Sequence, residues 1–397
     1  MPLIADRVNK FEESETLAMA KLARELKQQG KDVINLSTGE PDFDTPNHIR
    51  EAAKKAIDEG HTHYPPVTGY AELKNAICAK FESGNSLKFS SNQIVVSTGA
   101  KQSIMNTLLA TINPSDEVLL PAPYWVSYPQ MIKMVDGIPV ILDTQIQSDF
   151  KITSEQLENS ITEKTKMLIL TSPCNPTGTV YSYEELNSIA TILKDHPNIL
   201  IISDEIYEHI NFAGQHNSIA QFEEIKDRVI VVNGVSKGFA MTGWRIGYIA
   251  AQETIAKACE KIQGQFTSGA SSISQHAALS ALSSNLDETH KMCDEFKNRR
   301  DLLLNLLKDV SGVKTNVPDG AFYLFPDISE YIGKSDGENT INSSKELCMY
   351  LLNQHSLALV PGEAFGNGNC IRISYAASTE VIEEAIRRLK SGLETLA

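Results

Sequence analysis

The alternation of short apolar runs with amphipathic stretches between Gln93 and Ala251 limits the folds open to this chain more than any other feature. The apolar runs are rich in β-branched residues, as buried strands are, and the stretches between them are long enough for crossover helices. This order predicts a mostly parallel sheet flanked by helices. The seven candidate strands are Ile94–Ser97, Glu117–Leu120, Pro139–Leu142, Met167–Thr171, Ile199–Ser203, Val229–Asn233 and Trp244–Ala250.

Beyond Ala251 the pattern becomes helical, and Asp287–Val310 is expected to form one long helix that bridges two domains. The 397 residues are enough for two domains. We therefore predict an α/β fold with a large domain of residues 47–285 and a small α+β domain of residues 286–397. An N-terminal segment of residues 1–46 is expected to pack with the small domain.

Net charge and cysteine spacing exclude several classes of protein. The net charge is −14 and no block of Lys and Arg appears, which disfavours a surface for nucleic acid or an anionic membrane. The six cysteines include no Cys-x-x-Cys pair, so neither a disulfide framework nor a metal site is indicated. Since the N-terminus lacks the apolar core of a signal peptide and no run reaches membrane-spanning length, we expect a cytoplasmic protein.

Lys237 and Arg245 lie in a run of small residues that directly follows a predicted strand. Open α/β sheets bind their ligands at the carboxyl ends of strands, so both cations are candidates to meet a buried anion. The alternative is that the two cations are solvated surface charges near a turn.

Other predicted strands end in groups that would complement a charged, aromatic ligand. The turn at Gly99 leads from a strand into a helix, whose N-terminal N–H groups favour a phosphate. Asp204 is placed to stabilise a protonated ring nitrogen. Asn175 offers an amide donor, and Trp125 offers a flat face on which a ring can stack. Separately, a plain turn, a helix cap, an Asn-Pro turn and a core tryptophan explain the same four features.

Together and in order, these stretches resemble the class I aminotransferases, the pyridoxal-phosphate enzymes of fold type I, over essentially the whole chain. The resemblance implies that Lys237 forms the Schiff base with pyridoxal 5′-phosphate and carries the proton between the substrate α-carbon and the cofactor. It implies that Asp204 partners the ring nitrogen, that Asn175 and Tyr207 bond the phenolic oxygen, and that Trp125 stacks on the ring.

The resemblance also implies a phosphate site and a dimer. The residues that it places around the cofactor phosphate are Gly99, Ala100, Ser236 and Arg245, with Lys101 in the same turn as the first two. Tyr64 matches the tyrosine that reaches the phosphate of the neighbouring subunit, which implies a homodimer with shared active sites. A loop aromatic packed on its own subunit is the other explanation of Tyr64.

Arg372 lies within an otherwise apolar predicted strand, where a guanidinium calls for a planar anion or a protein partner. The resemblance makes Arg372 the group that binds the substrate α-carboxylate. It gives Gly39 a backbone contact on the other side of the substrate, with Trp125 and Asn175 also in contact with it.

Ser14, Thr16 and Lys101 resemble the residues with which the bacterial Iβ aspartate aminotransferases recognise the side-chain carboxylate. The same threonine and lysine occur in relatives that also aminate prephenate. Between Lys261 and Arg299 this chain has no arginine to serve as the second carboxylate-binding arginine of other acidic-substrate members.

Three acidic residues depart from the subgroup pattern, because Glu12 and Glu13 precede Ser14 and Glu15 follows it. Carboxylates at the pocket mouth would repel an acidic substrate, whereas carboxylates that face solvent would not.

The expected function is ping-pong transfer of an amino group between L-aspartate and 2-oxoglutarate, giving oxaloacetate and L-glutamate. The alternatives are a glutamate/aspartate-prephenate aminotransferase and a broad or aromatic amino acid aminotransferase of the same class. Lyases and aminocyclopropane-carboxylate synthases of this fold share the cofactor residues. A nicotinamide-dependent dehydrogenase is disfavoured, because no Gly-x-Gly-x-x-Gly follows an early strand.

Overall fold

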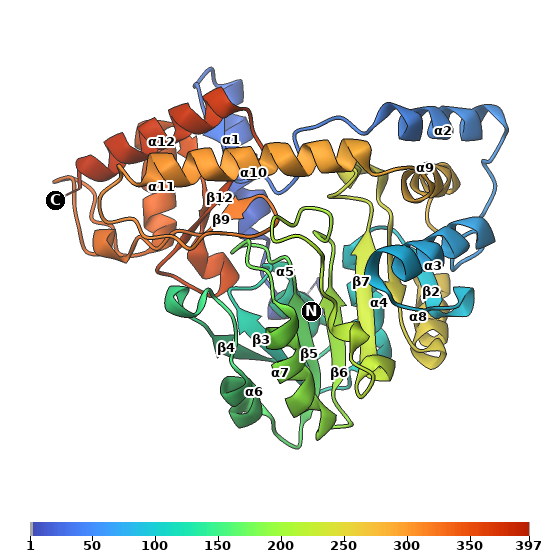
Figure 1. The fold of residues 1–397 in the computed structure, drawn as a ribbon. Coiled ribbons are helices and arrows are strands. Elements are labelled where there is room, and N and C mark those ends of the chain that lie inside the picture. The colour runs from blue at the N-terminus through green and yellow to red at the C-terminus, as the bar shows by residue number, and fades with distance from the viewer. Residues whose placement is uncertain (1–2, 397) are drawn as a thin grey trace.

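A seven-stranded sheet forms the centre of the larger part of the molecule in the computed structural model, which describes residues 3–396 (Figure 1). Its spatial order is β2-β8-β7-β6-β5-β3-β4, and only β8 runs antiparallel to its neighbours. The strands are β2 (Ile94–Ser97), β3 (Glu117–Ala122), β4 (Ile138–Asp143), β5 (Thr165–Thr171), β6 (Leu200–Asp204), β7 (Val229–Gly234) and β8 (Gly247–Ala250).

The prediction of a mostly parallel, seven-stranded sheet is confirmed. One strand begins later than the sequence indicates, at Gly247 instead of Trp244. Thr242–Trp244 forms a 3₁₀ turn, and Arg245 has a φ of 58°. A left-handed residue of this kind interrupts an extended strand, so the predicted start of β8 was wrong.

Both faces of the central strands are buried, whereas the edge strand β4 is partly exposed, which explains why the central strands are continuous apolar runs without polar alternation. Along β7, Val229 and Val231 pack into one core cluster, whereas Ile230 and Val232 pack into another on the opposite face. The helices in this part of the chain are α2 (Asn47–Asp58), α3 (Ala71–Asn85), α4 (Ala100–Thr111), α5 (Ser127–Met134), α6 (Ser154–Ser160), α7 (Tyr183–Lys194), α8 (Glu253–Phe266) and α9 (Ser272–Ser283).

A further core is built by both ends of the chain. Met19 and Leu36 share one apolar cluster with Leu324, Ile373 and Leu389. The elements around this core are α1 (Glu15–Gln28), β1 (Ile34–Asn35), α10 (Asp287–Leu307), β9 (Tyr323–Leu324), α11 (Ser344–His355), β10 (Leu357–Ala358), β11 (Val360–Pro361), β12 (Ile371–Ser374) and α12 (Thr379–Glu394). Two small sheets belong to this part of the molecule: an antiparallel sheet in the order β11-β12-β9 and a parallel pair of β1 and β10.

The long helix α10 crosses the upper part of the molecule in Figure 1, from the end of α9 to a packing contact with α12. It was predicted over Asp287–Val310 and ends at Leu307. The division of the chain into domains at residues 46 and 285 remains a prediction. Within residues 3–396, no helix combines the length and apolar character needed to span a membrane.

Candidate active site

A cavity of about 380 Å³ lies where the carboxyl ends of β5, β6 and β7 meet the start of α4. Every predicted site residue lines it except Gly99, which is next to the lining residue Ala100, and Tyr64. The lining comprises Ser14, Thr16, Leu17, Gly39, Ala100, Lys101, Ile104, Trp125, Val126, Ser127, Tyr128, Thr171, Asn175, Asp204, Ile206, Tyr207, Ser236, Lys237, Thr242, Arg245, Tyr323 and Arg372. Residues far apart in the sequence therefore converge on one chamber, as in enzyme active sites.

Lys237 lies in the turn after β7, with its ammonium group inside the cavity. Its Nζ donates a hydrogen bond to the Gly39 carbonyl oxygen at 2.6 Å. Burial, together with the positive charge of Arg372, lowers the pKa of Lys237 to about 8. A lysine with this pKa has a substantial neutral fraction near neutral pH, so it can act as a nucleophile and as a base.

Asp204 is the last residue of β6 and is only 4% exposed. Burial raises the pKa of Asp204 to about 6, although hydrogen bonds from Tyr128 and from the Ile206 N–H lower it. The Tyr128 hydroxyl donates to Oδ2 at 2.6 Å, and the Ile206 N–H donates to Oδ1 at 3.2 Å. These bonds fix the carboxylate in the cavity wall, where a protonated ring nitrogen would be a suitable partner.

Tyr128 and Tyr323 are site residues that sequence reasoning missed. The Tyr128 hydroxyl also lies 2.8 Å from Thr171 Oγ1, and its ring makes an edge contact with Trp125. The Tyr323 hydroxyl lies 2.8 Å from the Tyr207 hydroxyl. No pattern around Tyr128 in the sequence separates it from a core tyrosine, because Trp125 precedes the helix α5 that contains Tyr128.

Arg372 on β12 is only 1% exposed, so its charge is almost completely removed from water. Nη1 donates to Asn175 Oδ1 at 2.9 Å and Nη2 to the Ser37 carbonyl at 2.6 Å, whereas Nε has no partner within residues 3–396. Burial lowers the pKa of Arg372, and only the Tyr323 and Tyr207 phenols oppose this effect. A buried guanidinium without a carboxylate partner calls for an anionic ligand.

Gly39 faces the same part of the cavity as Arg372. A Cβ on Gly39 would lie 2.7 Å from the Tyr323 hydroxyl oxygen. Glycine therefore lets the backbone approach a ligand held between Gly39 and Arg372.

The start of α4 and Arg245 form an anion-binding cradle. Gly99 has a φ of 86°, and a Cβ at this position would lie 2.4 Å from Arg245 Nη2. Glycine thus permits both the turn and the approach of the guanidinium. Ala100 begins α4, so its N–H and the positive end of the helix dipole face the cavity. Together with Ser236, these donors fit the phosphate group of a cofactor such as the one that the resemblance implies.

Lys101 lines the cavity beside Trp125, with its Nζ 4.8 Å from the centroid of the Trp125 ring. Burial and the nearby charge of Arg245 lower the pKa of Lys101. Ser14 and Thr16 also line the cavity, and Thr16 Oγ1 is buried with no partner among the described residues. These three groups can bind an additional polar or anionic part of a ligand.

The acidic residues around Ser14 do not line the cavity. Glu12 and Glu13 are exposed. The Glu15 carboxylate accepts a hydrogen bond from Lys345 Nζ of α11 at 2.7 Å. Repulsion of an acidic ligand by these side chains is therefore weak, because they face solvent or a cation.

Tyr64 is not brought to this cavity in the single chain. It is 98% exposed. Its contribution to the site of a neighbouring subunit remains a prediction.

Comparisons with known proteins agree over nearly the whole chain. The family model "Aminotransferase class I and II" matches residues 31–389. A bifunctional aspartate aminotransferase and glutamate/aspartate-prephenate aminotransferase of Petunia hybrida is 51% identical over 99% of this chain and 83% of its own length. An aspartate/prephenate aminotransferase of Nitrosomonas europaea is 44% identical over 98% of this chain and 99% of its own.

Solved structures are similar as well. An aspartate aminotransferase from Rhizobium meliloti superposes with a TM-score of 0.96 at 40% identity and covers 100% of both chains. An aspartate aminotransferase from Thermus thermophilus with maleate gives a TM-score of 0.92 at 36% identity, over 99% of this chain and 100% of that one.

Proposed function

The chain belongs to the aminotransferase class I and II family, and within that family we propose that it transfers an amino group between L-aspartate and 2-oxoglutarate, giving oxaloacetate and L-glutamate. One observation carries the substrate assignment. Two cations that no carboxylate of residues 3–396 neutralises, the buried Arg372 and the more exposed Lys101, line the same cavity as Lys237. A dicarboxylic amino acid presents one carboxylate to each cation.

We propose pyridoxal 5′-phosphate as the cofactor, which when bound supplies an electron sink for the pair released at the substrate α-carbon. Gly99, Ala100, Ser236 and Arg245 would hold its phosphate. An ionised Asp204 would keep the ring nitrogen protonated, because a buried carboxylate needs a cation beside it.

Three further side chains would orient the ring. Trp125 provides a flat apolar face against it. Asn175 and Tyr207 would donate to its phenolic oxygen, while the Tyr323 hydroxyl holds the Tyr207 phenol in place at 2.8 Å.

Lys237 would attach the cofactor covalently and then act as base. Its Nζ, with a pKa of about 8, would take the proton released at the substrate α-carbon and hold it for delivery to the cofactor side. The same amine in both half-reactions gives ping-pong transfer, since one keto acid leaves before the second binds.

Arg372 would bind the α-carboxylate through its guanidinium, opposite the Gly39 backbone. Lys101, Ser14 and Thr16 would bind the distal carboxylate. This division lets the Lys237 region select the bond that breaks while the Lys101 side selects the side chain.

Aspartate/prephenate aminotransfer is the second candidate. The relatives in Petunia hybrida and Nitrosomonas europaea carry prephenate in their names. Prephenate also carries two carboxylates, so the same two cations suit it.

We also propose that the protein is a homodimer in which Tyr64 reaches the phosphate site of the partner subunit, and that it is cytoplasmic.

A panel of amino donors with 2-oxoglutarate, oxaloacetate and prephenate as acceptors tests the proposal. Aspartate with 2-oxoglutarate is expected to give the highest kcat/KM, and activity with prephenate would add the second function. A preference for neutral or aromatic donors over aspartate would contradict the assignment of Lys101.

A further inference from the structure

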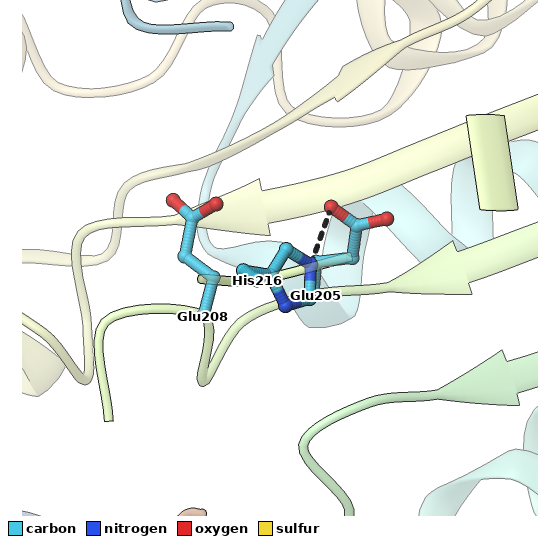
Figure 2. A group of neighbouring side chains, drawn as sticks. All are labelled: Glu205, Glu208 and His216. Carbon is cyan, nitrogen blue, oxygen red and sulfur yellow. Dashed lines mark ion pairs between the residues drawn. The ribbon is translucent and has the colours of Figure 1, made fainter. Parts of the chain in front are cut away.

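A buried cluster of charged side chains lies at the turn that follows β6, and Figure 2 shows Glu205, Glu208 and His216 of this cluster. Glu205 and Glu208 belong to this turn, His216 to the loop after it, and Lys80 to α3. Their side chains are 1%, 5%, 6% and 9% exposed, in that order. Charges so deeply buried persist only when they are paired.

Glu208 is held by groups from α3. Lys80 Nζ forms an ion pair with Glu208 Oε1. The Asn85 amide donates to Oε2 at 3.1 Å. Burial would raise the pKa of Glu208, but the charges of Lys80, His209 and His216 outweigh this effect and lower it to about 2. Glu208 is therefore a buried anion with Lys80 as its main counter-charge.

Glu205 is held by groups from the following loop. His216 Nε2 lies 3.1 Å from Glu205 Oε2, the pair that is dashed in Figure 2. The Ser203 and Ser218 hydroxyls donate to Oε1 at 2.8 and 2.5 Å. Burial would lower the pKa of His216, but the charge of Glu205 outweighs it and raises the pKa. The raised pKa favours the protonated form of His216, whose charge would balance Glu205.

A metal ion is the other arrangement that such a cluster suggests, since ligand atoms of Glu205, Glu208 and His216 lie within 4.8 Å of one another. However, one of the Glu208 carboxylate oxygens already forms an ion pair with the Lys80 ammonium group. Two carboxylates facing an ammonium and an imidazolium are electrically balanced without a divalent cation.

The side chains of Asp204 to Glu208, at the end of β6 and in the turn after it, point in two directions, into the cavity and into the buried cluster. Asp204 and Tyr207 line the cavity. Glu205 and Glu208, which alternate with them along the chain, are absent from the cavity lining and point into the buried cluster. Any movement of the two glutamates therefore moves the two residues that face the ligand.

The cluster also supports the turn that carries Lys237. His209 Nε2 lies 3.2 Å from Glu208 Oε1, and the His209 ring makes an edge contact with Phe239. A Cβ on Gly238 would lie 2.7 Å from His209 Cβ. Gly238 follows Lys237 directly, so the turn that carries Lys237 packs against His209, which is paired with Glu208 of the cluster.

We propose that the Lys80–Glu208 and His216–Glu205 pairs are positioning elements, which hold Asp204, Tyr207 and Lys237 in the geometry that cofactor binding and proton transfer need. The inference rests on the proposed function. Lys80 and His216 touch neither the cavity nor a ligand in it, so they act only through the turns that they support.

The test compares Lys80→Met and His216→Gln with the double variant Lys80→Met/Glu208→Gln, which removes both charges of one pair. Lys151→Met is the matched control. Lys151 is also a largely buried lysine, 15% exposed, and it pairs with Asp149 and Glu185 away from these turns. Three quantities are measured: the dissociation constant of pyridoxal phosphate from the apoprotein, kcat and KM for aspartate, and amide hydrogen exchange over residues 204–210 in the apoprotein.

Each single variant is expected to weaken pyridoxal phosphate binding and lower kcat by about tenfold, because small displacements of reacting groups are costly. KM for aspartate should change by less than about twofold, and exchange over residues 204–210 should accelerate. The double variant should recover most of the loss, and Lys151→Met should lower only the melting temperature.

Wild-type affinity, kcat and exchange in both single variants, with only a lower melting temperature, would overturn the proposal. A stoichiometric divalent ion whose removal reproduces the losses would overturn it too. Failure of the wild-type protein to bind pyridoxal phosphate would instead refute the proposed function, and the exchange measurement distinguishes the two results.

Discussion

Removal of one hydroxyl group, in Tyr128→Phe, is expected to weaken cofactor binding at neutral pH without disturbing the fold. The phenol donates to Asp204 Oδ2 at 2.6 Å, a bond that lowers the pKa of Asp204 against the stronger effect of burial. Hydrogen bonds to charged groups contribute about 1.5–3 kcal/mol. At about 1.4 kcal/mol for each pKa unit, the loss corresponds to a rise of about 1–2 units.

The sign of the pH dependence follows from the charge that the cofactor requires. Burial holds the pKa of Asp204 at about 6 in the apoprotein, so most of the carboxylate is ionised at pH 7. A further rise of about 1–2 units leaves at least about half of it protonated there. Affinity for a protonated ring nitrogen is present above the pKa of Asp204 and is lost as the pH falls through that pKa. As the pH is lowered, the variant should therefore begin to lose affinity at a higher pH than the wild type does.

Titration of the apoprotein with pyridoxal phosphate between pH 5 and 9 measures this effect. The dissociation constant of Tyr128→Phe is expected to begin rising about 1–2 pH units above the wild-type onset. Tyr331→Phe is the control, because the Tyr331 hydroxyl donates to the Ser311 carbonyl near the other core. Superimposable profiles for Tyr128→Phe and the wild type would refute the reasoning.

Three further substitutions separate the roles of the cations. Lys101→Val should reduce kcat/KM for aspartate and glutamate by about tenfold or more and change it little for a neutral donor, because only the distal carboxylate loses its partner. Equal losses for all donors would show that Lys101 has another role. Arg372→Lys should raise KM for every donor by at least about tenfold, since an ammonium cannot replace a two-pronged guanidinium; unchanged KM values would count against its contact with the α-carboxylate. Lys237→Met should stabilise the apoprotein at pH 7 by about 1–3 kcal/mol. The folded pKa of about 8 lies below the ordinary value of 10.5, so the penalty is full below pH 8 and disappears as the pH rises through 10.5; equal urea unfolding curves at pH 7 would contradict it.

Local patterns in the sequence were sufficient for the sheet and most of the cavity. Apolar runs without polar alternation identify β6 and β7, because both faces of these strands are buried. The glycine at 99 and the charged residues after β6 and β7 lie at strand ends, so a parallel sheet must bring them to the same edge.

Contacts between distant segments could not be predicted in the same way. The bond from Tyr128 to Asp204 joins α5, which packs on β3 and β4, to the end of β6, and nothing in the sequence near Tyr128 distinguishes it from a core tyrosine. The Glu15 side chain forms an ion pair with Lys345, which lies in the remote helix α11, and this contact cannot be read from the sequence around Glu15. Arg245 has a positive φ and its guanidinium approaches Gly99, and its neighbours in the chain indicate neither feature.

The identity of the lysine is the centre of the proposed mechanism, and reduction with borohydride followed by peptide mass spectrometry tests it directly. After incubation with pyridoxal phosphate, the wild-type protein should carry one reduced cofactor on the peptide that contains Lys237. Lys237→Ala should carry none there and should lose transamination. Label on a different lysine, or undiminished turnover in Lys237→Ala, would contradict the mechanism.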